Sequence, residues 1–309
     1  MIWSILLTVV GLCVFEIISS IDNAIVNAEV LSTMGQRARR WFMTWGIIFA
    51  VFVVRGMLPW AIVWATNPSL GLFGSLTATF SNDPRVMESI EKSAPILMAG
   101  GGMFLVLLFF HWLFVEPKEY GLIGEKFINS KAVWFYAVAS ILLVVTVWSA
   151  LKIDPMIAFA IVVGSSAFFI THGFKQQAEQ SEKQLVKSNV SDVSKIFYLE
   201  ILDMSFSIDG VLGAFAFTMS VPLILVGNGI GAIVLRKLTL GNIDRIKKYK
   251  YLKNGAMYSI LVLGIIMLAD GFGANVPQWL SPVVTILVVG FFLFKSIKAV
   301  DKKSTNSAA

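Results

Sequence analysis

The sequence predicts an all-α, polytopic membrane protein with about nine transmembrane helices, and two observations lead to that class. Hydrophobic residues make up 57% of the chain and charged residues only 14%, a balance that ordinary soluble domains do not have. The apolar residues also come in runs of about 20, the length that a helix needs to cross a hydrocarbon core. These runs do not alternate polar and apolar residues, as membrane β-strands would.

The apolar runs follow one another along the whole chain. In order, they are 2–28, 41–65, 94–115, 132–150, 154–173, 195–219, 221–238, 255–271 and 279–297. The run 195–219 is unusual because it contains three acidic residues, and 221–238 is short and rich in glycine. The first run lacks the basic start and the cleavage site of a signal peptide, so we expect it to remain as a span. The long connection 66–93 has the Gly, Pro and Asn content of irregular structure, with room for a short helix near 84–92.

Basic residues are distributed very unevenly between the two sides of these runs. Of the 25 Lys and Arg residues, Arg85, Lys92 and Lys152 fall on one side, Arg55 lies inside a run, and all others fall on the opposite side. The positive-inside rule assigns the basic side to the cytoplasm. The prediction is therefore an N-out, C-in chain in the plasma membrane. The net charge of +6 then reflects topology, and no nucleic-acid partner is expected.

The first and sixth runs share a polar pattern. Residues 14–28 read VFEIISSIDNAIVNA, and residues 199–214 read LEILDMSFSIDGVLGA. Each contains Ser-Ile-Asp, and an acid lies six residues before that Asp, Glu16 in one case and Asp203 in the other. Because five crossings separate the two runs, helices 1–3 and 6–8 form an inverted repeat about the membrane plane, as in many secondary transporters.

The repeat divides the chain into five predicted parts. They are a first repeat, an inserted helix pair with a cytoplasmic linker, a second repeat, a ninth helix and a disordered cytoplasmic tail, at 1–115, 116–193, 194–272, 273–298 and 299–309.

Acidic residues inside apolar spans indicate function, because each costs about 2.5–3.5 kcal/mol on insertion scales. On an ideal helix, Glu16, Ser20 and Asn23 share one face with Asn27, whereas Asp22 falls well away from Glu16. If the acids of both runs serve one cavity, the helices unwind near SSID and SFSID, as helices that line transporter cavities do.

The candidate ligands are almost all hard oxygen atoms, which suit Mn²⁺, Ca²⁺ or Mg²⁺ as a bound substrate. The candidate metal ligands are Glu16, Asp22, Asn23, Asp203 and Asp209. Further candidates for an ion pathway are Ser20, Asn27, Glu200, Ser207 and Asp270. Arg55 is the intramembrane cation that could pair with these acids. His111 and His172 are expected near cytoplasmic helix ends, in interfacial or capping roles or on an ion exit path.

Three segments resemble the TerC family, named for tellurium resistance, and in particular its DUF475-type branch. They read FEIISSIDNAIVNA, RRWFMTWGIIFAVFVVRGMLPW and LEILDMSFSIDGVLGAF, and the resemblance extends from residue 11 to about 290. It implies membership of the LysE-exporter-like superfamily and a role in manganese efflux or in supplying Mn²⁺ to extracytoplasmic proteins. It also implies that the acidic positions named above hold the metal. Many TerC proteins have Asp-Asn in the second motif, where this chain has Asp209-Gly210, so that half of the site has one side-chain ligand fewer.

The expected function is export of a divalent cation, Mn²⁺ first, by alternating access at a midplane acidic site, with proton exchange. The chain has no GxxxxGK[ST] motif, so ATP is not its direct energy source. One alternative is a non-transporting membrane scaffold with a structural metal or a hydrogen-bonded acid network. LysE-type export of an organic solute fits less well, since many acids with one Arg favour a cation. No enzyme is expected, because HExxH, GxSxG and Gly-x-Gly-Asp are all absent. The sequence leaves a homo-oligomer open.

Overall fold

The computed structural model describes residues 2–46, 48–49, 56–57, 60–61, 64, 71–78, 84–187 and 191–306. All regular structure in these residues is helical. The helices are α1 (Ile2–Ser19), α2 (Ile21–Ser32), α3 (Gln36–Trp41), the π-helix η1 (Phe42–Gly46), α5 (Gly71–Ala78), α6 (Pro84–Phe114), α7 (Glu125–Asn129), α8 (Trp134–Leu151), α9 (Pro155–Lys187), α10 (Asp192–Phe215), α11 (Val221–Lys248), α12 (Leu252–Gly271) and α13 (Leu280–Asn306).

Six of the described helices are long and apolar enough to cross a membrane. Their apolar stretches are Ile2–Ser19, Ser93–Phe114, Trp134–Leu151, Pro155–Phe174, Leu252–Gly271 and Leu280–Val300. α11 contributes only a shorter apolar stretch, Val221–Leu235, and the acids of α10 interrupt its apolar character. Most of the predicted run 41–65 lies outside the described residues. The all-helical membrane class is therefore confirmed, while nine spans, the orientation and the inverted repeat stay predictions.

Several helices are longer than the apolar runs predicted. α6 begins at Pro84, so the short helix expected near 84–92 is its first part. α9 continues to Lys187, well beyond the apolar run that ends at 173, and takes up much of the predicted linker. α13 continues to Asn306, into the segment predicted to be a disordered tail. Polar residues can extend a helix past the apolar part because the hydrogen-bonded ladder, once started, propagates cheaply.

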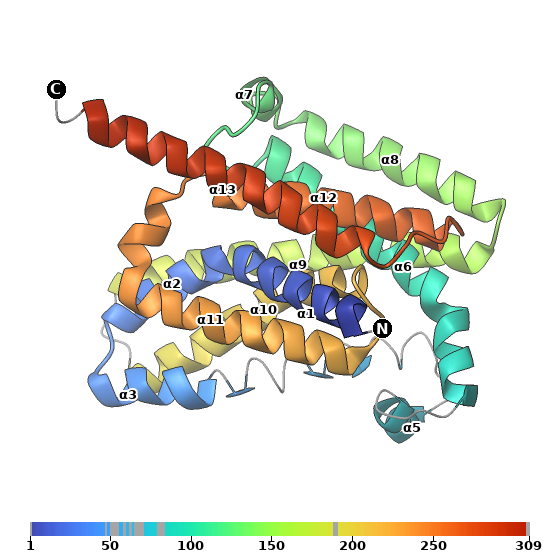
Figure 1. Ribbon diagram of the computed structural model, residues 1–309, viewed down its shortest axis with the longest axis horizontal. Coiled ribbons are helices and arrows are strands. Elements are labelled where there is room, and N and C mark those ends of the chain that lie inside the picture. The colour runs from blue at the N-terminus through green and yellow to red at the C-terminus, as the bar shows by residue number, and fades with distance from the viewer. Residues whose placement is uncertain are drawn as a thin grey trace.

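α6 lies at the centre of the bundle and packs against α9 and α12 (Figure 1). Three consecutive glycines, Gly100–Gly102, make this close packing possible. A Cβ atom at Gly100 would lie 2.9 Å from the backbone oxygen of Ala160 in α9, and one at Gly102 would lie 2.8 Å from that of Gly264 in α12. Small residues at helix interfaces let backbones approach in this way within membranes.

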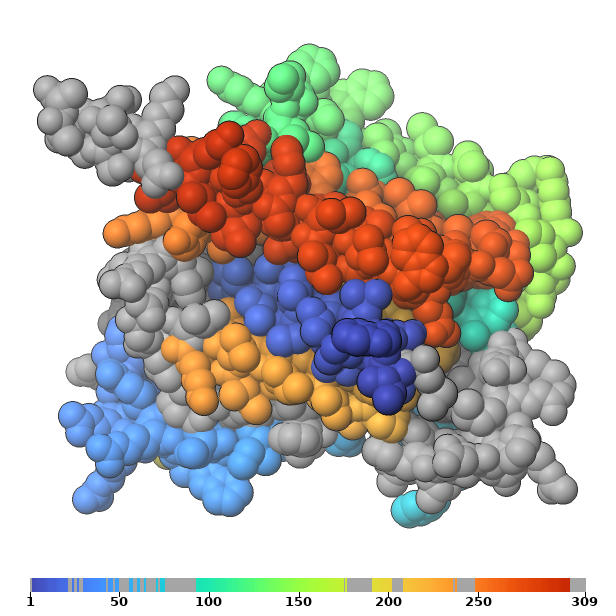
Figure 2. Space-filling view, viewed as in Figure 1, coloured from blue at the N-terminus to red at the C-terminus, as the bar shows by residue number. Residues whose placement is uncertain are grey.

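α1 lies between α13 and α11, and it shows at the surface as a strip between them (Figures 1 and 2). These three helices run in the same direction (Figure 1), and for α11 the contacts show it, because Leu12 lies against Gly227 and Glu16 against Gly231. α10 runs antiparallel to α1. α12 is likewise antiparallel to α6, and α9 is parallel to it. These directions agree with the alternation that successive membrane crossings require.

The outer surface is strongly apolar, as lipid contact requires. α8 is the clearest case: only 17% of its apolar stretch is buried inside the protein. Its large exposed side chains include Trp134, Tyr136, Ile141, Val144 and Trp148. A helix that is apolar on all sides, but packs against the protein on one side only, is suited to lie between the protein and the lipid.

Candidate functional site

Glu16 is the most deeply buried of the predicted site acids whose side chains the structure describes. Its side chain is 1% exposed, in the last turn of the apolar α1 helix. The Ser20 hydroxyl donates a hydrogen bond of 2.7 Å to Glu16 Oε1. A carboxylate in such surroundings is costly unless it is protonated, paired or bound to a cation.

Glycines on two neighbouring helices bring their backbones close to Glu16. A Cβ atom at Gly231 of α11 would lie 2.7 Å from the Glu16 Cβ, and one at Gly210 of α10 would lie 3.4 Å from Glu16 Oε2. Glu16 therefore lies where α1, α10 and α11 meet. Because Gly210 has no side chain, the Glu16 carboxylate lies against the backbone of α10 at this position.

The predicted unwinding of the two motifs is found in the first only, and in a slight form. α1 ends at Ser19 and α2 begins at Ile21, with Ser20 between them. The backbone hydrogen bonds nevertheless continue, from Ser20 N to Glu16 O at 3.1 Å and from Ala24 N to Ser20 O at 2.9 Å. In the second motif the prediction was wrong, because α10 is an unbroken helix through 205–209. No proline or positive-φ residue interrupts that stretch, so the i to i−4 ladder is maintained.

Three of the described acids, Glu16, Asp209 and Glu200, are spread along the helices as a column rather than gathered in one cluster. Glu16 lies level with Gly210, next to the partly buried Asp209. At 1.5 Å per residue, Asn27 on α2 and Glu200 on α10 lie about 15 Å further along the bundle. Leu199 packs with Val30 and Leu31 there, which agrees with this register. Among the described side chains, no three acids, histidines or cysteines come together as a ready-made metal site.

At the far end of this column, Asn27 and Glu200 are both largely removed from solvent. Asn27 is 7% exposed, and its Oδ1 has no hydrogen-bond partner among the described residues. Glu200 lies against η1, since a Cβ atom at Gly46 would be 2.5 Å from Glu200 Oε1. The side chains of Asp22, Asn23, Arg55, Asp203 and Ser207, which the sequence also assigned to the site, lie outside the described residues.

Asp270 lies apart from this column, in a cavity at the opposite end from Asn27. The cavity has a volume of about 330 Å³ and is lined by the end of α10 and the segment after α12, with no basic residue among the lining side chains. Asp270 Oδ1 accepts a hydrogen bond of 2.5 Å from the backbone N–H of Val276. Phe217 lines the cavity and also packs on Phe15, the residue before Glu16, with ring centroids 5.6 Å apart.

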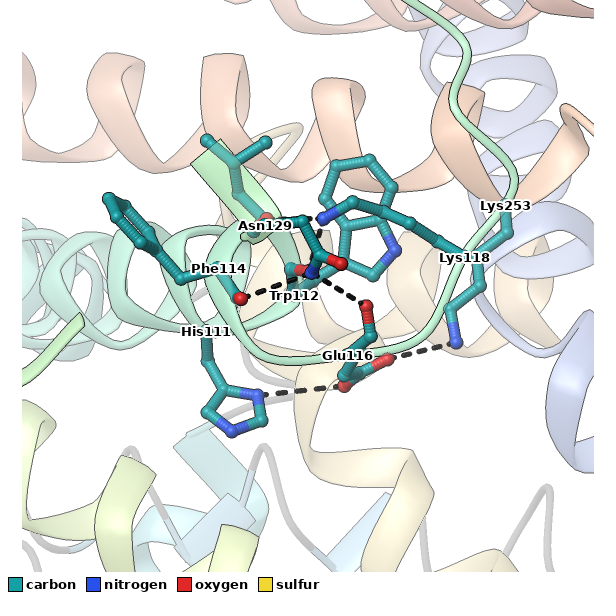
Figure 3. Close-up of polar contacts among 8 residues, drawn as sticks. His111, Trp112, Phe114, Glu116, Lys118, Asn129 and Lys253 are labelled. Atoms are coloured by element: carbon teal, nitrogen blue, oxygen red, sulfur yellow. Dashed lines mark hydrogen bonds and ion pairs between the residues drawn. The ribbon is translucent and has the colours of Figure 1, made fainter. Parts of the chain in front are cut away.

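A second group of polar residues lies where α6 ends, and of this group only the histidines were expected there (Figure 3). Glu116 Oε2 forms an ion pair with Lys253 Nζ at 2.9 Å, and Glu116 Oε1 lies 3.7 Å from His111 Nδ1. Asn129 donates to the backbone oxygens of Phe114 and Glu116 at 3.0 and 3.1 Å. His111 is 6% exposed, and its ring centroid lies 3.8 Å from that of His172, so the two predicted helix-end histidines meet.

Glu125 of α7 is also buried at this end, with a complete set of donors. Its side chain is 2% exposed. It accepts hydrogen bonds from the Tyr258 hydroxyl at 2.9 Å, from Asn254 Nδ2 at 3.1 Å and from the Gly121 N–H at 2.6 Å. Nearby, burial lowers the pKa of Lys118 from 10.5 to about 8, although Glu125 and Glu116 pull it upward. The sequence did not indicate the burial of Glu125. It lies in the segment GLIGEKF, between two apolar runs, and its partners on α12 are distant in sequence.

Asn228 on α11 is a second residue that the sequence reasoning missed. It is 1% exposed, and neither atom of its amide has a hydrogen-bond partner in the described part of the chain. The available signal was the stretch GNG at 227–229, a polar residue between glycines inside an apolar run.

Comparison with known proteins places the chain in a family. Residues 21–303 match the family described as "Protein of unknown function (DUF475)". The chain belongs to this family. A relative of this DUF475 chain in Bacillus subtilis (strain 168), "Uncharacterized membrane protein YceF", is 26% identical over 108 residues. That match covers 35% of the DUF475 chain and 41% of the relative. No solved structure matches it.

Proposed function

We propose that this DUF475 protein is a secondary transporter that exports a divalent cation, with Mn²⁺ as the expected cargo. The observation that carries the proposal is Glu16, a carboxylate 1% exposed at the meeting of three helices within a membrane protein. Burying an acid there costs free energy, and a role in an ion pathway explains why the acid is present. The resemblance of the acidic motifs to TerC proteins supports Mn²⁺ as the cargo and a LysE-like relationship.

The proposed pathway follows the column of oxygen atoms along the bundle. In this view the cation enters near Asn27 and Glu200, passes Glu16 and Asp209, and leaves through the Asp270 cavity. The N-out, C-in orientation and the inverted repeat of nine spans belong to this proposal, as does location in the plasma membrane. Protons would return as the cation leaves, because the acids can accept them. The proposal includes no catalytic step and no nucleic-acid partner.

Alternating access requires that only one end of the pathway is open at a time. Phe15 and Phe217 are 0% and 1% exposed, and their packed rings lie between Glu16 and the Asp270 cavity. Gly213 lies directly against the Phe15 ring, so no gap remains on the α10 side. We therefore interpret this conformation as closed toward the cavity.

The test is Mn²⁺ flux in proteoliposomes that contain the purified protein. Glu16→Gln, Asp22→Asn and Asp209→Asn keep side-chain size but remove charge, and each should reduce flux at least tenfold. Glu125→Gln is the matched control, because it neutralises an equally buried acid that has its own donors; flux per folded protein should then stay within twofold of wild type. Equal flux in wild type and Glu16→Gln would contradict the proposal.

A non-transporting scaffold is the second candidate, and the Ser20–Glu16 hydrogen bond is the observation that favours it. In that case neither the wild type nor any variant transports Mn²⁺, Ca²⁺ or Mg²⁺. Glu16→Gln and Ser20→Ala would instead lower the thermal stability of the protein in detergent by similar amounts.

A further inference from the structure

Asn228 is buried in a way that no contact within the described protein explains. An amide has two donors and two acceptor sites, and burying them unpaired opposes folding. Both the oxygen and the nitrogen of Asn228 lack a partner among the described residues, at 1% exposure. Buried groups of this kind in native proteins call for a specific reason, such as a missing ion.

The position of Asn228 connects it to the acidic column. α11 packs against α1, α2 and α10, the helices that also supply Glu16, Asn27 and Asp209. Gly227 lies against Leu12 and Gly231 against Glu16, so Asn228 is level with the turn of α1 just before Glu16. At 1.5 Å per residue the offset along the axis is about 4.5 Å, in the direction of the Asp270 cavity.

We propose that Asn228 is a ligand of the transported divalent cation, at a position between Glu16 and the Asp270 cavity. This inference rests on the proposed function. The amide oxygen is a hard, neutral ligand of the kind that Mn²⁺, Mg²⁺ and Ca²⁺ accept. A neutral ligand next to a carboxylate holds the cation less strongly than a second carboxylate would, which suits a position from which the cation must leave.

The test uses Mn²⁺ alone and compares thermal unfolding of purified protein with and without the metal. A ligand that binds only the folded state raises the unfolding temperature. Asn228→Leu removes the unpaired amide, so the metal-free variant should unfold at a higher temperature than metal-free wild type. The apparent affinity for Mn²⁺ should fall at least tenfold, and the metal-induced shift should shrink accordingly.

Thr285→Val is the matched control. Thr285 on α13 is 0% exposed, and its hydroxyl also has no hydrogen-bond partner among the described residues. It lies on a helix outside the group that surrounds Glu16 and Asp209. Its replacement should leave the Mn²⁺-induced shift within error of wild type. Asn228→Asp, nearly identical in size, should strengthen Mn²⁺ binding at least threefold and gives a second measurement if Asn228→Leu folds poorly.

The outcomes separate this inference from the function on which it rests. If wild type shows a Mn²⁺-induced shift that Glu16→Gln abolishes, while both Asn228 variants shift like wild type, the ligand role of Asn228 is overturned and transport is not. If wild type shows neither a shift nor flux, the proposed function fails and Asn228 loses its role with it.

Discussion

Glu16 and Glu125 are equally buried acids that lie in different parts of the protein. The two side chains are 1% and 2% exposed. Glu125 receives three hydrogen bonds from α12 and from the loop before α7, an arrangement that anchors α7 to the bundle. Glu16 accepts a hydrogen bond from Ser20 and lies against the backbones of two other helices at Gly210 and Gly231. Glu125 therefore connects a short helix to the bundle, whereas Glu16 lies inside the bundle, where the proposed cation pathway passes.

Glu125→Gln should lower stability. The amide cannot accept all three hydrogen bonds, and its own N–H donors would face the donors of Tyr258, Asn254 or Gly121. A buried donor left without an acceptor costs about 1–3 kcal/mol. Chemical unfolding in detergent measures this loss. Tyr258→Phe removes one of the same donors and should cost less; a Glu125→Gln variant as stable as wild type would show that α7 docks by other contacts.

Lys118 should make stability rise with pH between about 8 and 10.5. Its pKa is lowered to about 8 in the folded protein from an ordinary value of 10.5. Below pH 8 Lys118 is protonated in both the folded and the unfolded state, and the folded state bears the full cost of the buried charge. Between pH 8 and 10.5 the unfolded state binds more protons than the folded state, so the free energy of unfolding increases with pH. Lys118→Met should flatten this slope in pH-dependent unfolding.

Lys250→Met is the control for that measurement. The hydrogen bond to Glu119, at 3.1 Å, raises the pKa of Lys250 above its ordinary value. The stabilising effect is therefore complete below pH 10.5 and is lost only as the pH passes the raised pKa. Lys250→Met should leave the slope between pH 8 and 10 as it is in wild type.

At the scale of whole helices, the glycines of α6 and α9 determine how closely the central helices pack. A Cβ atom at Gly164 would overlap the backbone oxygen of Gly100, and Gly100 itself lies against Ala160. Gly173, further along α9, has open space around the same position. One helix therefore carries glycines with opposite roles.

Gly164→Ala should destabilise the protein by about 1–3 kcal/mol or more, the usual cost of overpacking a core. Gly173→Ala should be neutral or stabilise by about 0.5–1 kcal/mol, because alanine is the better helix former. Thermal unfolding of the two variants side by side checks both. Equal effects would mean that α6 and α9 do not approach as closely as described.

The sequence predicted helices well and their contacts poorly, for physical reasons that particular residues make clear. Apolar runs indicated α6, α8, α12 and α13, because lipid imposes both length and composition on a span. The acids were found because polarity inside such runs is conspicuous. The burial of Glu125 and Asn228 depends on helices that are distant in sequence. The serines of SFSID are compatible with continuous backbone hydrogen bonds, so they did not show whether α10 is broken or unbroken. Only Asn228 had a local sign in the sequence, the stretch GNG at 227–229, and that stretch does not show which helices cover it.

For the whole molecule, the aromatic contact between Phe15 and Phe217 lies between two positions of the proposed pathway. Glu16 lies on one side and the Asp270 cavity on the other. Phe217→Ala should open a passage between them. In proteoliposomes we expect Mn²⁺ to move down its gradient without a proton gradient, unlike in wild type. Phe104→Ala, a similar truncation in the α6–α9 contact, should lower stability without such a leak; tight coupling in Phe217→Ala would show that the barrier lies elsewhere.

The central place of α6 also has a consequence for biosynthesis. The stretch Ser93–Phe114 is 83% buried by other parts of the protein, and its glycines lie against α9 and α12. The ribosome, however, completes α6 long before α12, which begins only at Leu252. During that interval α6, the most buried of the six described candidate spans, has lipid where its partners will be. The bundle therefore cannot close around α6 until the last quarter of the chain has entered the membrane.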